Sequence, residues 1–256
     1  MNDAFVIGKG YVGKGTMKAL NIPWFFSRSE ANITLEEGAK KRFCFICLPT
    51  PTDEKGDQTD ARKVIHDYIA QIKEYGGNCI FVIRSTVLPG TCRALSEEFN
   101  VMVASNPEFL SEATWEADAV KPRLIVIGAD YLPVKIALES AWNRVFCKLR
   151  VSTDTVTAET VKYAFNSFMA TKVVWANAMY DVASVAGADY EVIHSTLHNH
   201  PWGSKEHLKV FDKMGRGAGG HCLPKDLKAL ATYGNSPFFK AVEQINKEYL
   251  AASGKE

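Results

Sequence analysis

Short apolar runs alternate with helical segments over the first part of the chain. Seven runs rich in β-branched and aromatic residues are expected to form strands, at residues 4–7, 24–27, 42–48, 79–84, 101–104, 124–128 and 145–150. Each run is followed by a turn or a helical segment. This alternation predicts an α/β fold with an N-terminal doubly wound parallel sheet.

The period of the pattern changes at Thr155, where a long helix-compatible run begins that extends to about Ala186. Further helices are expected at residues 190–197, 226–233 and 237–252. We therefore predict an α/β domain over residues 1–152 and a smaller all-helical domain with a long central helix over 153–256. The boundary between them rests on the change of period alone.

The charge balance favours a small-molecule partner. Lys and Arg number 30 against 29 Asp and Glu, a net charge of +1, which gives no electrostatic reason to expect nucleic acid or an anionic membrane. No apolar run is long enough to span a bilayer, and the first residues lack the basic and apolar regions of a signal peptide. A cytoplasmic location is expected.

The six cysteines are scattered and form no compact framework, so reduced thiols are expected. Cys44, Cys79 and Cys147 fall in runs that predict buried strands. The spacing of Cys44 and Cys47 is also found in redox and zinc sites. In a strand, however, residues three apart point to opposite faces, so core positions are favoured and no metal site is predicted.

A glycine-rich segment joins the first expected strand to a helix. It reads Gly8-Lys9-Gly10-Tyr11-Val12-Gly13. Glycines at this spacing allow a tight turn, close approach of the backbone to a pyrophosphate, and packing of the helix on the strand. The segment therefore predicts a Rossmann-type site for a nicotinamide dinucleotide.

The second expected strand ends in Phe26-Ser27-Arg28-Ser29, near the position where NAD sites usually carry an acid that binds the ribose hydroxyls. Arg28 stands there instead, and a guanidinium flanked by hydroxyls suits the 2′-phosphate of NADP. The alternative is a solvated arginine that stacks on adenine. These residues favour neither interpretation over the other.

Two further groups of polar residues are candidates for chemistry. Glu108 and Glu112 follow the fifth expected strand, and they would face one site if the turn there is helical. Carboxylates in such a place hold water or take a proton. Lys162 and Asn166 are one helical turn apart, where together they would hold an oxyanion or a sugar hydroxyl, although a solvated lysine is the more common case.

Cys222 lies just ahead of an expected helix, after a run of glycines, with His221, Lys225 and Asp226 as neighbours. A helix N-terminus and nearby cations favour a thiolate, so Cys222 is a candidate nucleophile. The alternative is a glycine loop capped by Asp226 that contains an incidental cysteine. This segment alone leaves both open.

Taken together, these segments resemble the UDP-glucose and GDP-mannose dehydrogenase family, whose members oxidise a nucleotide-sugar alcohol to the uronic acid in two NAD-linked steps. The resemblance rests on the glycine-rich segment 8–13, Pro49-Thr50-Pro51-Thr52, Ser85-Thr86-Val87-Leu88-Pro89-Gly90-Thr91, residues 106–112, Lys162-Tyr163-Ala164-Phe165-Asn166, and Gly219-Gly220-His221-Cys222-Leu223-Pro224-Lys225-Asp226. These segments occur in the family's order and cover nearly all of the chain.

The resemblance implies a role for each matching residue. Cys222 would attack the aldehyde formed by the first hydride transfer, giving a thiohemiacetal and then a thioester that water cleaves. Lys162 and Asn166 would stabilise the oxyanion with help from Asp226. Thr86 and Glu108 are similar to residues that position a water, and Glu112 is similar to one near the nicotinamide that serves thioester hydrolysis.

The resemblance also implies the binding residues. The cofactor would be NAD, or NADP with Arg28 as the ligand of its 2′-phosphate. The residues that would bind it are Gly8, Gly10, Tyr11, Val12, Gly13, Arg28, Pro49, Thr50, Thr86, Glu112 and Lys225. Those for the nucleotide sugar are Glu108, Phe109, Leu110, Lys162, Asn166, Lys209 and Gly219. A homodimer is expected as well, because the helix 155–186 resembles the family's dimer helix and carries apolar residues that a small domain would leave exposed: Phe165, Met169, Val173, Trp175 and Met179.

Three features depart from the family. The acidic ribose ligand is replaced by Arg28, and the stretch from Arg28 to Arg42 is shorter than usual. The loop 198–203 lacks the arginine that reaches a neighbouring subunit's substrate. The sequence also stops soon after Asn246, where the family continues into a second Rossmann-like domain. One competing hypothesis is a two-domain hydroxyacid dehydrogenase, which also uses a Lys and an Asn one helical turn apart but needs no thiol. The other, suggested by the missing domain, is a cofactor-binding remnant or partner subunit.

Overall fold

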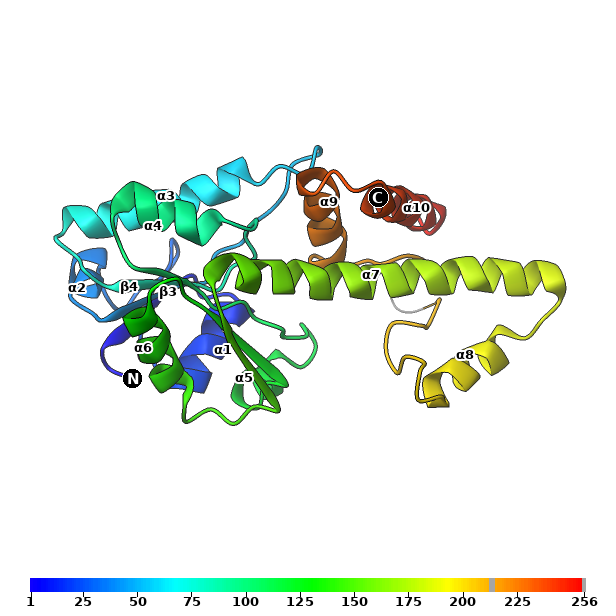
Figure 1. Ribbon diagram of the computed structural model, residues 1–256, viewed down its shortest axis with the longest axis horizontal. Helices are drawn as coiled ribbons and strands as arrows, with labels where there is room; N and C mark the ends of the chain where they lie inside the picture. The colour runs from blue at the N-terminus through cyan, green and yellow to red at the C-terminus, as the bar shows by residue number, and fades with distance from the viewer. Residues whose placement is uncertain (212–214, 255–256) are drawn as a thin grey trace. The chain divides into compact units, whose positions relative to one another are not determined.

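The computed structural model describes residues 1–211 and 215–254, which form two compact units (Figure 1). The first unit comprises Met1–Pro51 and Gln58–Lys162, and the second comprises Thr52–Asp57 and Tyr163–Glu256. The expected change of period coincides with the start of the long helix α7 at Thr155. The division between the units falls later in that helix.

The strands of the described chain form one seven-stranded sheet in the first unit, in the order β2-β1-β3-β4-β5-β6-β7. They are β1 (Ala4–Ile7), β2 (Trp24–Phe26), β3 (Phe43–Ile46), β4 (Ile80–Ile83), β5 (Val103–Ser105), β6 (Leu124–Gly128) and β7 (Leu149–Thr153). The doubly wound α/β fold is confirmed, with helices following the strands as predicted.

One pair of neighbouring strands departs from the expected parallel sheet. β5 and β6 pair antiparallel, through Ser105 and Gly128, whereas the other neighbours pair parallel. A parallel pair needs a crossover, usually a helix that carries the chain back along the sheet. The helix between these strands, α5 (Trp115–Val120), is six residues long, and its Glu116 instead pairs with Lys18 of α1 (Tyr11–Leu20) at 2.6 Å.

Helices cover both faces of the sheet, so the central strands are apolar throughout. All residues of β1, β3 and β4 are buried, as expected for strands with two covered faces. Residues of α1 and α6 (Leu132–Trp142) fill the core on one face. The other face is covered by α2 (Leu35–Ala39), α3 (Thr59–Glu74) and α4 (Thr91–Phe99), and Figure 1 shows α3 and α4 together on that side.

The buried cysteines belong to these cores. Cys44 packs in the core beneath α3, and Cys47 packs in the core beneath α1, so the two thiols point to opposite faces as predicted. Cys79 is also buried, immediately before β4. The prediction for Cys147 was wrong, because Cys147 is half-buried in a loop.

That loop replaces most of the strand expected at residues 145–150. β7 begins only at Leu149, because the chain makes a turn after α6 in which the Val145 N–H donates to the Trp142 carbonyl at 2.9 Å. The Val145 side chain is buried in the core beside α6. The apolar sequence around Val145 therefore reflects burial in a turn, which the sequence alone does not distinguish from burial in a strand.

The second unit is helical. It contains most of α7 (Thr155–Ala186), followed by α8 (Tyr190–Asn199), α9 (Leu223–Tyr233) and α10 (Pro237–Ala252). The predicted helices are confirmed, and α9 begins three residues earlier than expected because Pro224 suits the first turn of a helix. Among the helices described, none is long and apolar enough to cross a membrane.

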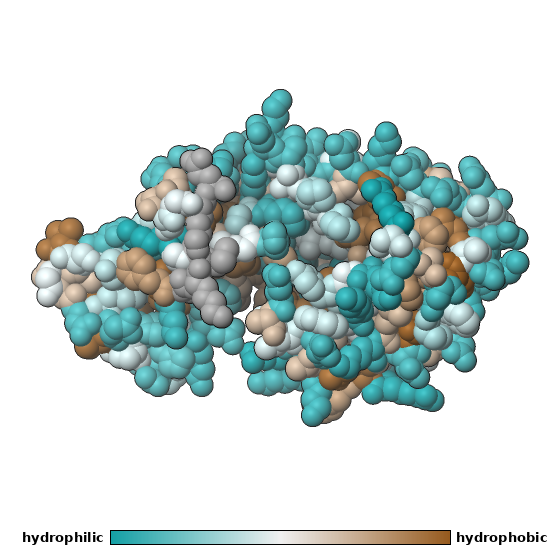
Figure 2. Space-filling model, turned by 180° about the vertical axis from the view of Figure 1, so that it is seen from behind, coloured by the Kyte–Doolittle hydropathy of each residue, from teal (hydrophilic) through white to brown (hydrophobic). Residues whose placement is uncertain are grey.

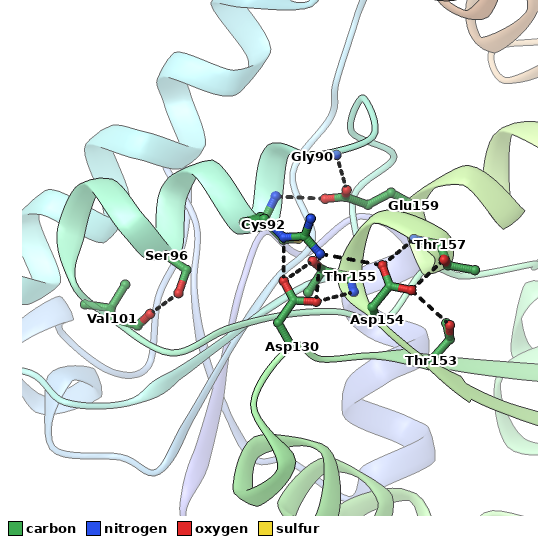
Figure 3. Close-up of polar contacts among 11 residues, drawn as sticks. Gly90, Cys92, Ser96, Val101, Asp130, Thr153, Asp154, Thr155, Thr157 and Glu159 are labelled. Atoms are coloured by element: carbon green, nitrogen blue, oxygen red, sulfur yellow. Dashed lines mark hydrogen bonds and ion pairs between the residues drawn. The ribbon is translucent and has the colours of Figure 1, made fainter.

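Polar groups fix the start of α7 in the first unit (Figure 3). The Asp130 carboxylate accepts the N–H of Thr155 at 3.0 Å and its hydroxyl at 2.8 Å, and Arg93 Nε donates to the same carboxylate at 3.0 Å. Asp154 accepts the Thr157 N–H at 3.0 Å. The hydroxyl and the N–H of Thr157 lower the pKa of Asp154 to about 2, so this cap is charged at neutral pH.

Glu159, one turn further along α7, is 2% exposed. Its Oε2 accepts the Gly90 N–H at 2.6 Å, and its Oε1 accepts the Cys92 N–H at 2.8 Å. These N–H groups belong to the start of α4, where helices leave donors without partners of their own. Burial raises the pKa of Glu159, while the two N–H groups act in the opposite direction.

The structure predicts that Glu159→Ala will lower the free energy of unfolding by about 2–4 kcal/mol, because two buried N–H donors lose their acceptor. Chemical denaturation at neutral pH measures this change. Glu98→Ala serves as the control, since Glu98 is an exposed residue whose partners lie on the surface. A loss no greater than that of the control would contradict the assignment.

The raised pKa of Glu159 also predicts the sign of a pH effect. A native state that binds a proton more tightly than the unfolded chain is stabilised at low pH, and this stabilisation is lost as the pH rises through the native pKa. The wild type should therefore lose stability relative to Glu159→Gln as the pH rises above the ordinary pKa of a glutamate. A constant difference between the two proteins would count against it.

Candidate active site

The glycine-rich segment 8–13 has the geometry of a pyrophosphate-binding turn. Gly8 has φ +94°, and a Cβ on Gly8 would lie 2.4 Å from the Cys47 carbonyl oxygen. A Cβ on Gly13 would lie 1.9 Å from the Gly8 carbonyl oxygen, whereas one on Gly10 would meet nothing within 4 Å. α1 begins directly after Gly10 without a side-chain cap. Open space before an uncapped helix N-terminus fits a dinucleotide phosphate.

Tyr11 and Glu112, both implied as cofactor ligands, are joined across the first unit. The Tyr11 hydroxyl donates to Glu112 Oε1 at 2.8 Å, and both side chains are exposed. The segment that follows β5 is thereby held beside the first turn of α1. Val12, the next residue along α1, is half-buried and packs against the core.

A cavity of about 580 Å³ lies beyond β2, lined by residues 26–31 and by part of α3. Arg28 is exposed in this lining, as is Glu30. Lys9 Nζ donates to Glu30 Oε2 at 2.9 Å and lies 3.8 Å from the centre of the Phe25 ring. Glu30 was missed in the sequence because the acid was sought at the end of the strand, although Glu30 also follows Gly8 by about 20 positions.

The loops after β3 and β4 are joined by Ser85, to which no role was assigned from the sequence. Its hydroxyl donates to the Leu48 carbonyl at 2.7 Å and accepts the Leu48 N–H at 2.8 Å. The loop of Pro49 and Thr50 is thereby brought to the loop of Thr86. Pro49 is exposed, Thr50 is buried and Thr86 is half-buried.

Glu108 forms an ion pair with Lys162 inside the first unit. Lys162 Nζ donates to Glu108 Oε1 at 3.1 Å, and the side chains are only 7% and 11% exposed respectively. The Leu110 N–H donates to Glu108 Oε2 at 2.7 Å, and Lys162 Nζ lies 5.3 Å from the centre of the Phe109 ring. Lys162 is therefore not a solvated lysine, and the Glu108 carboxylate holds its ammonium in place.

A shared site for Glu108 and Glu112 depended on a helical turn, and the described structure has none at this place. Residues 106–111 are irregular, and α5 begins only at Trp115. The Glu108 carboxylate instead caps its own loop through the Leu110 N–H. Glu108 and Glu112 therefore have different partners, Lys162 and Tyr11.

Arg84, directly after β4, holds the segment that carries Glu108. Its Nη1 donates to the carbonyl oxygen of Asn106 at 3.2 Å and also to Asn106 Oδ1, while Asn106 Nδ2 donates to the Val126 carbonyl at 2.6 Å. Arg84 is 6% exposed, and burial lowers the pKa of its guanidinium. The sequence contains no signal for this buried cation, because its partner Asn106 follows a different strand, β5.

In the second unit, Asp226 is the centre of a buried polar group. Asp226 is 1% exposed, and its Oδ2 accepts Asn166 Nδ2 at 2.5 Å while Oδ1 accepts Lys225 Nζ. The carboxylate therefore does not cap the glycine loop, which was the alternative interpretation. Asn166 itself is 9% exposed.

Cys222 is exposed and stands at the N-cap position of α9, as predicted from its place ahead of a helix. Its carbonyl oxygen accepts the Asp226 N–H at 3.0 Å, which places the thiol residue one turn from the buried carboxylate. Cys44, Cys47, Cys79 and Cys92 are buried instead. Burial raises the pKa of Cys47 to about 11.

The other residues that the resemblance implies for substrate binding each lie within one unit, either in a packed segment or in the lining of a cavity. Leu110 is half-buried, and its Cδ1 would lie 3.3 Å from a Cβ on Gly15 of α1. In the second unit, Lys209 and Gly219 both line a cavity of about 480 Å³. The candidate residues thus form one set around Glu108 and Lys162 and another around Asn166 and Asp226, and α7 carries a member of each.

Comparison with known proteins matches both units. Residues 28–146 match the sequence model of the UDP-glucose/GDP-mannose dehydrogenase family, NAD binding domain, and residues 156–248 match that of the same family's central domain. The UDP-glucose 6-dehydrogenase of Rickettsia felis is 32% identical over 235 residues, which are 85% of this chain and 50% of the relative. The chain thus spans about half the length of the curated relatives it matches.

Solved structures agree on the fold. A UDP-glucose dehydrogenase from Pyrobaculum islandicum has a TM-score of 0.83 at 25% identity, covering 97% of this chain and 68% of that one. The 3-hydroxyisobutyrate dehydrogenase of Mycobacterium tuberculosis has a TM-score of 0.75 at 12% identity, covering 98% and 94%. The second likeness shows a shared fold alone.

Proposed function

Because the chain belongs to the UDP-glucose/GDP-mannose dehydrogenase family, we propose that it oxidises the primary alcohol of a UDP-glucose-like nucleotide sugar to the uronic acid in two hydride transfers. The observation that carries this proposal is the exposed Cys222 thiol at the start of α9, one turn from a buried Asp226 that holds Asn166. A dehydrogenase that stops at the aldehyde or ketone needs no such nucleophile.

We propose NAD as the cofactor, bound at the uncapped start of α1 with its adenosine half toward the cavity beyond β2. When bound, its nicotinamide accepts the hydride in each oxidation step. Glu30 offers a carboxylate to the ribose hydroxyls, while Arg28 in the same lining offers a guanidinium to a 2′-phosphate. Lys9 holds the Glu30 carboxylate and limits its movement.

Lys162 and Asn166 would stabilise the negative charge that develops on the substrate oxygen. Lys162 supplies an ammonium whose burial strengthens its effect on a nearby oxyanion. Asn166 gives one amide N–H to Asp226, so its orientation is fixed and its other N–H is available to an oxyanion. Lys225 satisfies the second oxygen of Asp226, which makes Asp226 a positioning residue for the amide.

Cys222 would supply covalent catalysis between the two oxidations. Its sulfur adds to the carbonyl carbon of the aldehyde and gives a thiohemiacetal. The thiohemiacetal becomes a thioester when its carbon gives a hydride to the oxidised cofactor and its hydroxyl gives a proton to solvent. Water then cleaves the thioester and releases the acid and the thiol. Glu108 and Thr86 would position this water, and Glu112, held by Tyr11, would assist the hydrolysis.

We also propose a homodimer formed through α7. Phe168, Trp175 and Val182 are 60%, 44% and 58% exposed, and their spacing of seven residues places them in one stripe along the helix. Of the five residues first expected there, Phe165 and Trp175 are exposed, whereas Met169, Val173 and Met179 are half-buried. Hydrophobic side chains reach the surface of the second unit in several places (Figure 2, left).

For the chemistry, we predict that Cys222→Ser will lower the formation of uronic acid at least about 100-fold, because a serine hydroxyl at neutral pH is a far weaker nucleophile than a thiolate. A panel of nucleotide sugars is incubated with NAD and with NADP, and reduced cofactor and uronic acid are measured. Mass spectrometry of the wild type should find a substrate adduct on Cys222.

Cys147→Ser is the matched control, since it removes a half-buried thiol of the first unit and should keep full activity. Full turnover by Cys222→Ser would contradict the thiol mechanism and favour a hydroxyacid dehydrogenase. Cofactor binding without reduction by any sugar nucleotide would favour a remnant or partner subunit.

For the cofactor, we predict that Glu30→Ala will raise the KM for NAD about tenfold with little change in kcat, because a charge-assisted hydrogen bond to the ribose is lost. Glu36→Ala, which removes an exposed carboxylate from α2, is the control. If NAD use is unchanged and Arg28→Ala instead weakens the use of NADP, then Arg28 determines the preference.

For the dimer, sedimentation at micromolar concentration should show two copies, and Trp175→Glu should yield monomers, because burying an unpaired carboxylate is costly. Val192→Glu, at a residue of α8 that is 60% exposed, should leave the dimer intact. A monomeric wild type would exclude this interface.

A further inference from the structure

The cavity of about 480 Å³ in the second unit is rich in cationic side chains. Its lining includes His194 and His198 from α8, and Lys205, His207 and Lys209 from the loop after α8. Within the described lining, Glu206 is the acid. The two α8 rings have centroids 6.0 Å apart, and His194 Nδ1 also lies 3.6 Å from Glu191 Oε2 on the same helix.

The charges around this cavity favour an anionic ligand. Burial lowers the pKa of Lys172, and burial together with the Lys172 charge lowers that of His207. Glu206 offsets this only in part. His207 Nδ1 is buried and has no hydrogen-bond partner within the described structure. A bound anion would stabilise the charged forms of these groups and give that nitrogen a partner.

The lining of the cavity also includes the glycine loop that leads to Cys222. Gly219, Gly220 and Leu223 line it, and Cys222 stands between the last two in the chain. Gly220 has φ +78°, and a Cβ there would meet nothing within 4 Å, so the backbone is open on that side. A ligand held by the cations therefore lies beside the loop that carries the candidate nucleophile.

We propose that this cavity binds the diphosphate of the nucleotide sugar through His194, His198, Lys205 and Lys209. The inference rests on the proposed function, because it assigns part of the same substrate to the second unit. Several cations from two segments suit a group with many anionic oxygens better than a single carboxylate, which needs one partner. The volume is in the range of small-molecule sites.

The test is titration calorimetry of the full chain with inorganic pyrophosphate, at low salt and about pH 6.5. The wild type should bind pyrophosphate, and Lys205→Ala/Lys209→Ala should weaken the affinity at least about tenfold. Both lysines are exposed, so this variant should fold. His194→Ala/His198→Ala should weaken it similarly, with circular dichroism checking the fold.

Matched controls remove the same charges elsewhere. Lys240→Ala/Lys247→Ala takes two exposed lysines from α10, and His66→Ala/His200→Ala takes two histidines outside the cavity lining. Both should bind within about twofold of the wild type. No binding by the wild type at millimolar pyrophosphate, or equal losses in the controls and the cavity variants, would overturn the proposal.

Pyrophosphate binding does not depend on hydride transfer, which separates the two proposals. The cavity variants could lose pyrophosphate binding while no nucleotide sugar is oxidised by the wild type. This result would support the anion site and contradict the proposed dehydrogenase activity. Oxidation that proceeds with an unchanged KM in Lys205→Ala/Lys209→Ala would overturn the anion site alone.

Discussion

The structure of the first unit depends on one buried carboxylate. Glu159 is an acid placed where burial opposes its charge, and it is tolerated because the first turn of α4 offers it two N–H donors. This contact, with Asp130 and Arg93 beside it, fixes where α7 starts and how it is rotated about its own axis. Lys162, less than one turn further along, therefore meets Glu108 on the same side of the unit. The contact of Glu159 with α4 thus positions a candidate catalytic residue, although Glu159 is not itself proposed as one.

Much of the fold was readable because burial and secondary structure coincide in a covered sheet. β1, β3 and β4 are buried at every residue, and such strands stand out as continuous apolar runs. The pattern failed at Val145, where burial occurs in a turn. It also predicted the wrong direction for β6. The direction depends on whether the preceding helix crosses the sheet, and the sequence of α5 does not show what this helix packs on.

The candidate site divides in the same way. Glycines at a phosphate-binding turn and a cysteine ahead of a helix are local features, so Gly8, Gly13 and Cys222 were found with their settings. Arg84 and Ser85 were missed because each acts through a partner on another loop or strand. The irregular segment at Glu108 was missed for a related reason. Its conformation is held by the contact of Glu108 with Lys162 and by that of Asn106 with Arg84, and both contacts join residues that are distant in sequence.

Burial also separates the thiols by their exposure to chemical damage. Cys44, Cys47, Cys79 and Cys92 are enclosed, and the raised pKa values of Cys44, Cys47 and Cys92 keep these thiols protonated at neutral pH, so peroxides and alkylating reagents meet Cys222 first. Oxidation of this protein would then proceed in two stages, with the exposed sulfur modified while both cores of the sheet stay intact. The protein would stay folded after Cys222 has been oxidised. Reductants that reverse a sulfenic acid or a mixed disulfide would therefore restore the thiol of an intact protein.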